Sequence, residues 1–398
     1  MKHLKKYIIA LVALSAVIIS SCRKEIPQLN RPEDYVAANF NEVFDAYWTG
    51  MNNNYVFWDI DTTDWDRVYK TYKPLFAKLN LYDEKDVRKS YTYFKEMTAG
   101  LVDSHYDLSF RDQDLMNDSG SISPAFERKV KSPDYHPSIR NVSLYHFYDT
   151  IPRKYLDPTW KRGFTNLPND QVIGVAGTIN QNILYFYFSG FNLTDLYNDS
   201  TNATNRFRLA EKYFFDLLQS TPNIKGIILD VRGNGGGSLA DLDFLLGRMI
   251  DKPLHFGYTR SKQGNGRLDY SPWAPAYVKP QPGAKAVAAP IVVLADAWSV
   301  SMAEITTMAV KTLPNGHFVG ERTWGGNGPL TGNKFYQGGQ FTTGFFNLVY
   351  TSSLMFKNLD GKIYEGVGYP PEKEVKFNAA ALKSGRDMQL EAAIGLIR

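Results

Sequence analysis

Residues 226–238 read GIILDVRGNGGGS, and this stretch decides the fold that the chain is expected to have. Residues 226–229 form a continuous apolar run, which is typical of a strand buried on both faces of a parallel sheet. The run ends at Asp230, and glycines follow before a helical pattern begins near Leu239. Glycines let a backbone approach a ligand, and the N–H groups at a helix start favour negative charge. The loop is therefore either a tight strand-to-helix turn or an oxyanion-binding loop; the Lys-Ser/Thr ending of a phosphate-binding loop is missing.

The rest of the chain after Gln171 repeats this alternation of strand and helix. Strands are predicted at residues 183–188, 226–229 and 290–295, and helices at residues 205–219, 239–249 and 301–312. Such an order predicts an α/β domain, here residues 171–398, with a mainly parallel sheet covered by helices. Near its end, residues 334–350 alternate glycine with Phe, Thr and Val, which suggests an antiparallel hairpin.

The preceding residues have a different pattern. Residues 34–110 are predicted to form a small N-terminal helical domain, because apolar residues recur at helical spacing from Phe40 and because Asp64 and Asp83 open two further helical stretches. Residues 111–170 are rich in Asp, Asn, Ser and Pro and show no clear period. This segment is interpreted as an irregular insertion or lid.

The first residues have the pattern of an export signal. Basic residues precede an apolar run at residues 7–19, which is too short to span a membrane, and small residues then lead to Cys22. This ending resembles the lipobox of bacterial lipoproteins, which predicts a signal peptide at residues 1–21, lipidation of Cys22 and a tether at residues 22–33. The protein is then expected in the cell envelope, anchored on the periplasmic side of a membrane or at the cell surface. Because Cys22 is the only cysteine, no disulfide within the chain, thiol catalysis or CxxC metal site is expected.

Charge and composition exclude other functions. Lys2, Lys5 and Lys6 belong to the predicted signal; without them the chain has 42 basic against 41 acidic residues. No dense basic stretch remains, so nucleic-acid binding is not expected.

Two further loops contain side chains suited to catalysis. Residues 296–304 read DAWSVSMAE at a second strand-to-helix junction, where Ser301 is either an ordinary helix cap or a nucleophile. Residues 101–105 read LVDSH, where His105 is either structural or a base. The loops after residues 229 and 295 both end strands expected to share one sheet, and ligands collect at such edges.

Five motifs in order resemble the C-terminal processing peptidase and tricorn-core family of serine peptidases. They are D-S/G-H at residues 103–105, D-x-R-x-N-x-G-G at 230–237, S-x-S-x-x-E at 299–304, G-E/T-x-T-x-G at 320–325 and E-G-x-G-x-x-P at 365–371. The resemblance spans roughly residues 40–375 and implies a crotonase/ClpP-like core. Residues 111–170 are too short and irregular for the PDZ domain that many processing peptidases carry.

The resemblance also implies a particular catalytic form. Where the processing peptidases have a catalytic lysine, this chain has Gly326, so the Ser–Lys dyad is absent. The tricorn form uses the histidine of the upstream segment, which matches His105, together with groups that match Ser104 and Glu365. By the same resemblance, the backbone N–H groups of Gly236 and Met302 form the oxyanion hole.

These features predict a serine endopeptidase or oligopeptidase that hydrolyses short or unfolded peptides through a Ser301 acyl-enzyme. Neither a metal nor a cofactor is expected, and the oligomeric state is left open. Two alternatives stay open: a carrier of lipophilic ligands or peptides on the same fold, and an esterase or amidase for a non-peptide substrate.

Overall fold

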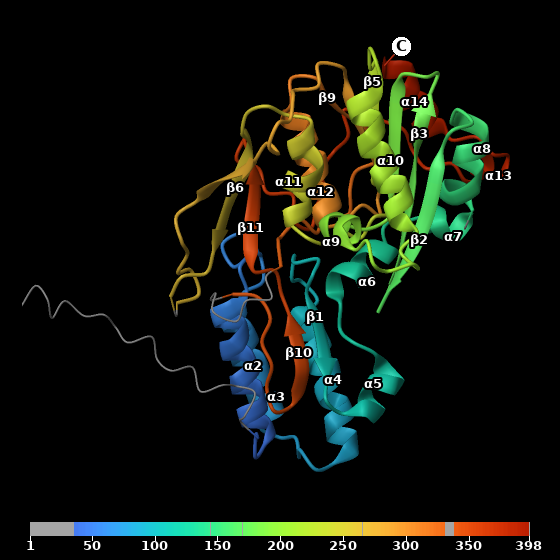
Figure 1. Cartoon of the computed structure of the whole chain (residues 1–398). Helices are drawn as coiled ribbons and strands as arrows, with labels where there is room; N and C mark the ends of the chain where they lie inside the picture. Colours follow the sequence, from blue (N-terminus) through green and yellow to red (C-terminus); the bar gives the residue numbers. More distant parts are fainter. Residues whose placement is uncertain (1–35, 144, 169, 265, 331–337, 398) are drawn as a thin grey trace, which may run out of the picture.

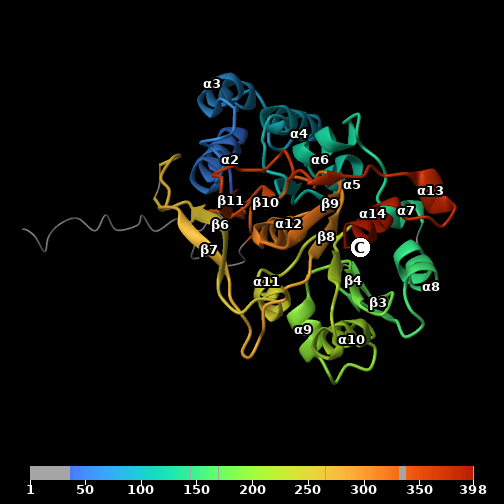
Figure 2. The same cartoon turned by 90° about the horizontal axis from the view of Figure 1, so that it is seen from above.

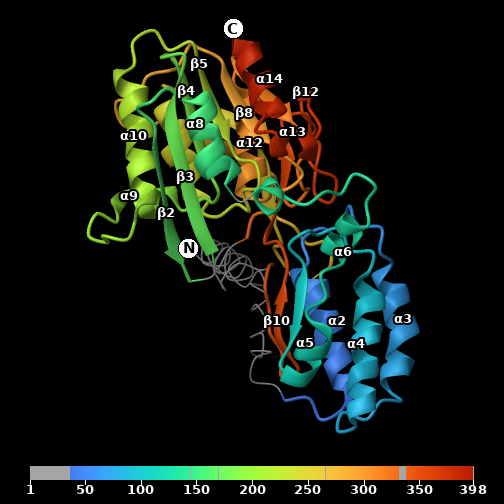
Figure 3. The ribbon, with the colours of Figure 1, turned by 90° about the vertical axis from the view of Figure 1, so that its right-hand side faces the viewer.

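The computed structural model describes residues 36–143, 145–168, 170–264, 266–330 and 338–397. A helical part built from the first described residues lies at one end of the molecule, and an α/β part lies at the other (Figures 1 and 3). The predicted signal peptide, the tether and the lipidated Cys22 lie outside the described residues and stay predictions. No helix within the described ranges is both long enough and apolar enough to cross a membrane.

A seven-stranded sheet organises the α/β part. Its order is β12-β9-β8-β5-β4-β3-β2. The pairs from β12 to β4 are parallel, whereas β4·β3 and β3·β2 are antiparallel. The expected mainly parallel sheet is thus present, extended by an antiparallel edge. The strands are β2 (Lys161–Leu167), β3 (Asp170–Ile179), β4 (Ile183–Phe188), β5 (Gly226–Asp230), β8 (Ile291–Ala295), β9 (Gly316–Gly320) and β12 (Lys373–Glu374).

Helices cover both faces of this sheet, as Figure 3 shows for α10 and α14. All six residues of β4 are buried because alternate side chains enter two cores: Phe186 packs with one set of helices and Tyr185 with the other. The first face carries α9 (Leu193–Asn198), α10 (Phe207–Ser220), α11 (Ala240–Leu245), the 3₁₀ turn η3 (Leu246–Arg248) and α12 (Met302–Thr312). The second carries α7 (Ile139–Val142), the π-helical turn η2 (His146–Thr150), α8 (Ile151–Tyr155), α13 (Ala379–Lys383) and α14 (Met388–Ile397).

The helical part begins with three capped helices, α2 (Phe40–Asn54), α3 (Trp65–Phe76) and α4 (Glu84–Thr98). Asn39, Asp64 and Asp83 each accept a hydrogen bond from a first-turn N–H, which fixes where each helix starts. Aromatic side chains fill the core between these helices. Figures 1 and 3 both show α6 next to this part, with α10 in the other part of the molecule, and Figure 2 shows the same arrangement from above.

A strand from the other end of the chain completes the helical part. β1 (Asp107–Phe110) pairs antiparallel with β10 (Phe346–Tyr350), and Phe346 and Val349 enter the same aromatic core. The predicted hairpin at residues 334–350 lies partly outside the described residues; within them, Phe341 forms an antiparallel bridge with Val349. A separate three-stranded sheet contains β6 (Leu254–Ser261), β7 (Ala274–Val278) and β11 (Leu354–Asn358), in the order β11-β6-β7.

Residues 111–170 are more regular than the sequence suggested. They contain α5 (Gln113–Ser119), α6 (Pro124–Val130), α7, η2, α8, β2 and the start of β3. The interpretation as an irregular insertion is therefore wrong for this segment. Helices of four to seven residues make at most two turns, which is too short for an apolar period to appear in the sequence.

Candidate active site

Ser301 lies between β8 and α12 in an unusual backbone conformation. Its φ of 56° and ψ of −118° lie outside the regions that L-residues normally occupy, and its hydroxyl makes no capping hydrogen bond to the helix. The helix-cap alternative is therefore not supported, because a capping serine accepts a hydrogen bond from the first turn. A serine held in a strained turn at a helix start presents its Oγ away from the helix.

The glycine loop lies directly against Ser301. A Cβ added at Gly236 would lie 2.6 Å from Ser301 Cβ and 2.9 Å from the Met302 nitrogen, so only glycine fits there. The two loops meet because β5 and β8 are neighbouring parallel strands. Within the described chain, the Met302 N–H has no acceptor, whereas the Gly236 N–H donates to Asn234 Oδ1 at 2.8 Å. Of the two predicted oxyanion donors, only Met302 is free in this conformation.

Three polar residues of the same loop shape it. Asp230, Arg232 and Asn234 are all fully buried. Arg232 donates to Asp230 and, at 2.8 Å, to Asp387 at the start of α14. Asn234 donates to the Phe188 carbonyl at 2.8 Å, which ties the loop to the end of β4. These contacts hold the loop against the ends of the strands, and none of the three side chains is exposed to a substrate.

His105 belongs to a buried hydrogen-bond chain. Its Nδ1 lies 3.3 Å from Ser352 Oγ, which donates to Asp103 Oδ1 at 2.8 Å. The backbone N–H groups of His105 and Ser352 also donate to Asp103. Because the Ser352 hydroxyl gives its proton to Asp103, its oxygen can accept one from Nδ1. This assignment leaves Nε2 unprotonated, as a general base requires.

Burial also sets the protonation of this chain. Desolvation lowers the pKa of His105, and the negative charge of Asp103 opposes part of this effect. Burial raises the pKa of Asp103. His105 is therefore held as the neutral imidazole near pH 7, with a carboxylate placed to stabilise the imidazolium when it forms.

Glu365 and Ser104 join the His105 segment to the α/β part. Glu365 is buried, and it accepts hydrogen bonds from the N–H groups of Ser104, Asn327 and Gly328 at 2.8–2.9 Å. Ser104 Oγ donates to the Gly325 carbonyl at 2.6 Å. Both predicted site residues thus bind backbone, and neither hydrogen-bonds to the His105 ring in the described structure.

Residues 323–328, called the strap below, hydrogen-bond to both the Ser301 segment and the His105 segment. The Ser301 N–H donates to the Gly326 carbonyl at 2.9 Å, and a Cβ at Gly326 would lie 3.1 Å from Ser104 Cβ. Glu304 of α12 holds the strap through the N–H groups of Gly325 and Gly326 at 2.8 and 2.6 Å. Burial raises the pKa of Glu304 to about 7. The Ser301 segment and the His105 segment therefore both contact one fixed backbone segment.

No hydrogen bond joins Ser301 Oγ to His105 among the described residues. Catalytic contacts of this kind are often long in ligand-free proteins and shorten when substrate binds. The structure thus places Ser301, Gly236 and Met302 together, and His105 beside the Ser104 and Glu365 that bind the same strap.

Asp103, His105 and Glu365 also form the one group in the described residues with the composition of a metal site, their ligand atoms lying within 4.8 Å of one another. All four carboxylate oxygens already accept hydrogen bonds. A metal held at about 2.0–2.2 Å would have to displace these bonds, so the group fits an ion poorly.

Sequence reasoning missed two members of the site. Asp103 stood inside the D-S-H segment without a role, and Ser352 had no local signal. Ser352 comes just after β10, and the antiparallel pairing of β10 with β1 brings it beside His105, which comes just before β1.

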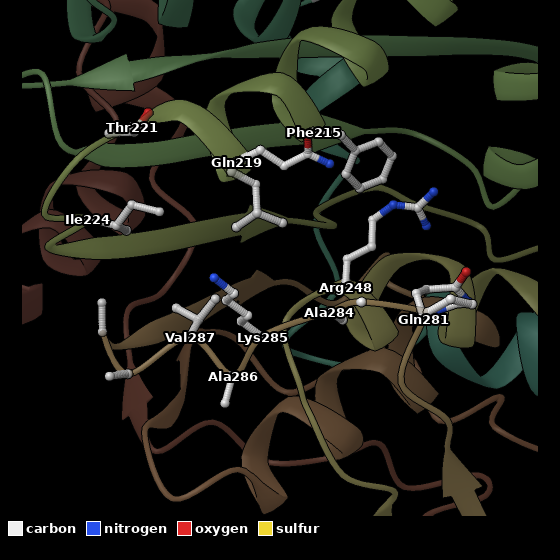
Figure 4. A pocket seen from close by; sticks show the side chains of 15 residues that line it. Phe215, Gln219, Thr221, Ile224, Arg248, Gln281, Ala284, Lys285, Ala286 and Val287 are labelled. Carbon is white, nitrogen blue, oxygen red and sulfur yellow. The ribbon is translucent and has the colours of Figure 1, made fainter.

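Another pocket, of about 690 Å³, lies elsewhere. Figure 4 shows it between Phe215 and Gln219 of α10 on one wall and residues 284–287 on the other. None of the predicted site residues lines it.

Two family models and two curated relatives match parts of the chain. The model of peptidase family S41 matches residues 197–361, and that of the tricorn protease C1 domain matches residues 36–84. The tricorn protease of Thermoplasma acidophilum is 26% identical over 182 residues, which are 46% of this chain and 15% of that protein. A tricorn protease homologue of Streptomyces coelicolor is 28% identical over 43% of this chain and 13% of its own length. The chain thus spans less than a fifth of the curated relatives that it matches.

Solved structures show the same fold. A structure assigned as a peptidase from Parabacteroides merdae covers 91% of this chain and 97% of its own, with a TM-score of 0.65 and 24% identity. The structure of mature CPAF covers 90% of this chain and 96% of its own, with a TM-score of 0.58 and 12% identity. The matching family models and the curated relatives are those of peptidases. The chain is thus similar to peptidases of family S41 and to tricorn proteases over these parts of its length.

Proposed function

We propose that the chain is a serine endopeptidase or oligopeptidase with Ser301 as nucleophile and His105 as general base. One observation carries the proposal: Ser301 is held at positive φ against Gly236, and the strap that binds its N–H also binds the His105 segment. A carrier protein has no need for a strained serine beside a buried histidine whose Nε2 is free.

The reaction follows from these positions. Ser301 Oγ attacks the peptide carbonyl carbon while His105 Nε2 takes its proton. The oxyanion is stabilised by the Met302 N–H and by a donor of the glycine loop; one such donor is typically worth about 3–4 kcal/mol. His105 then returns the proton to the leaving amine, and water hydrolyses the acyl-enzyme by the same route.

The backbone of the glycine loop has to move slightly before the Gly236 N–H can donate to the oxyanion. The Gly236 N–H is bound to Asn234 Oδ1, so it reaches the oxyanion only by sharing or leaving that bond. Gly236 and Gly237 both have positive φ, and glycine tolerates such changes at little cost. Substrate binding would supply the free energy for this movement.

Covalent labelling with a fluorophosphonate tests the proposal. Wild type is expected to be labelled, Ser301→Ala to be unlabelled, and His105→Ala to be labelled at least about a hundredfold more slowly because the base is missing. Ser119→Ala removes an exposed serine and serves as the control. Labelling that persists in Ser301→Ala refutes the nucleophile. Wild type that is neither labelled nor cleaves denatured protein supports the carrier alternative, whereas labelling with ester but no peptide hydrolysis supports the esterase.

We also propose that a lipid on Cys22 anchors the enzyme to a membrane of the cell envelope. The basic start, the apolar run and the small residues before Cys22 support this. Fractionation of cells that express wild type or Cys22→Ser tests it: wild type is expected with membranes and the variant without them. Equal distribution of the two proteins contradicts the anchor.

A further inference from the structure

A second pocket, about 520 Å³, lies beside the catalytic segments. One side of it is formed by Ser104, Trp324 and Gly366, which belong to the site already described. The other side comes from α6 and the residues that follow it, including Lys129. Because Ser104, the chain neighbour of His105, lines this pocket, the pocket is a candidate for holding part of a substrate.

Lys129 is an unusual feature of this pocket. The side chain is half-buried and lies over the Trp324 ring, with Nζ 5.2 Å from the ring centroid. Within the described residues, its only hydrogen-bond acceptor is the Trp324 carbonyl at 3.4 Å, and no carboxylate lies within ion-pair distance. Desolvation lowers the pKa of Lys129. A half-buried ammonium without a carboxylate is unfavourable unless a ligand supplies one.

Glu304 and Glu321 act on Lys129 from a distance, but none of the described charged side chains of the lining forms an ion pair with it. Arg128 and Arg322 also line the pocket, and their described hydrogen bonds go to backbone carbonyls only. Glu321 is already bound to His136 and to the Phe377 N–H. The remaining charged lining side chains are exposed: Asp134, Glu374 and Lys376.

An aromatic wall connects the pocket to the nucleophile. Phe126 stacks on Trp324 with 5.9 Å between centroids, and Trp324 contacts Trp298 at 5.3 Å. The Trp324 N–H donates to the Ser299 carbonyl, two residues before Ser301. A ligand on this wall would therefore lie against the segments that hold both nucleophile and base.

We propose that this pocket binds a carboxylate of the peptide substrate through Lys129, so that the enzyme prefers peptides with a negative charge near the cleaved bond. The carboxylate belongs to an acidic side chain or to a free C-terminus. This inference rests on the peptidase function proposed above and adds its substrate class.

Matched peptide pairs test the preference. One pair differs by Glu against Gln near the cleaved bond, and the other by a free against an amidated C-terminus. Wild type is expected to show about tenfold higher kcat/KM for the charged member of one pair, as a hydrogen bond to a charged group allows, and the pair that responds identifies the source. Lys129→Met is expected to bring that ratio close to one, and Lys129→Arg to retain most of it. Lys131→Met, which removes an exposed lysine two residues away, should keep the ratio of wild type.

Three results would overturn the proposal that Lys129 binds a substrate carboxylate. They are the absence of any preference in wild type, an unchanged ratio in Lys129→Met, and an equal fall for both members of each pair, which would place Lys129 in the catalytic machinery. Thermal unfolding of each variant verifies that it is folded.

Binding by the Ser301→Ala variant separates this inference from the proposed function. Calorimetry with the same peptides is expected to show tighter binding of the charged member, lost in Ser301→Ala/Lys129→Met. If wild type cleaves no peptide but binds the charged peptide more tightly, the carboxylate site at Lys129 stands and the peptidase function is refuted. If the protein cleaves peptides without binding the charged one more tightly, the peptidase function stands and the carboxylate site is refuted.

Discussion

Ser301 is held in a backbone conformation that costs a residue with a Cβ about 1–3 kcal/mol. The surrounding hydrogen bonds, from the Ser301 N–H to the strap and from the helix to its carbonyl, maintain it. We predict that the free energy of unfolding of Ser301→Gly is about 1 kcal/mol larger than that of Ser301→Ala, because glycine relieves the strain and alanine does not. Urea unfolding of the two inactive variants measures the difference. Equal stability would mean that the turn is not strained.

His105 is expected to act as a base down to unusually low pH. Burial lowers its pKa, so the neutral form persists below the ordinary value of about 6.5, and the acid limb of kcat/KM should lie below that pH. Asp103 opposes this shift. Asp103→Asn should therefore move the acid limb to still lower pH and reduce kcat by about 10²-fold or more. An acid limb above pH 6.5 in wild type would contradict the burial of His105.

Ser352 should matter more than Ser104 for the chemical step. Ser352 Oγ is the hydrogen-bond partner of the His105 ring, whereas Ser104 Oγ binds the Gly325 carbonyl. We predict that Ser352→Ala lowers kcat about tenfold and shifts the pH profile, while Ser104→Ala changes KM and stability more than the profile. Steady-state kinetics across pH distinguish them. A larger pH shift in Ser104→Ala would favour the site of His105, Ser104 and Glu365 that the family resemblance implies.

At this scale the sequence identified the glycine loop and the serine because both follow apolar strands that share a sheet. Ser352 stayed hidden because a serine in a Thr-Ser-Ser stretch has no periodicity and no spacing to His105. Only the pairing of β10 with β1 brings Ser352 to the His105 ring.

Long elements were predicted well from the sequence. The apolar strands at residues 183–188, 226–229 and 290–295 became β4, β5 and β8 because nearly every residue in them is buried. The short helices of residues 111–170 were missed, as was the pairing of β10 with β1. Pairing over such a sequence separation depends on the assembled core and leaves no local pattern.

Helix α12 controls the strap through Glu304. Its pKa of about 7 exceeds the unfolded value of about 4.5, so the native state binds the proton more tightly and loses stability as pH rises between these values. Glu304→Gln removes this dependence. We predict that the unfolding free energy of wild type, relative to Glu304→Gln, falls by about 3 kcal/mol from pH 4.5 to 7. Parallel pH profiles for the two proteins would refute the shift. Lower kcat is also expected, because an amide cannot accept from both strap N–H groups.

The two parts of the molecule should unfold together. β10 completes the helical core, and Glu365 binds both Ser104 and the strap. We predict one cooperative transition, with coincident midpoints for far-UV circular dichroism, tryptophan fluorescence and fluorophosphonate reactivity. Reactivity that disappears well before the circular dichroism signal would instead show that the helical part separates first.

The bond between Ser104 and Glu365 also has a consequence in time. These residues are 261 positions apart, and ribosomes add about 5–20 residues per second, so roughly 13–52 s separate their synthesis. A growing chain carries His105 early, yet until residue 365 is added it lacks the carboxylate that holds the Ser104 backbone against the strap. The proposed active site therefore cannot assemble before residue 365 has been synthesised.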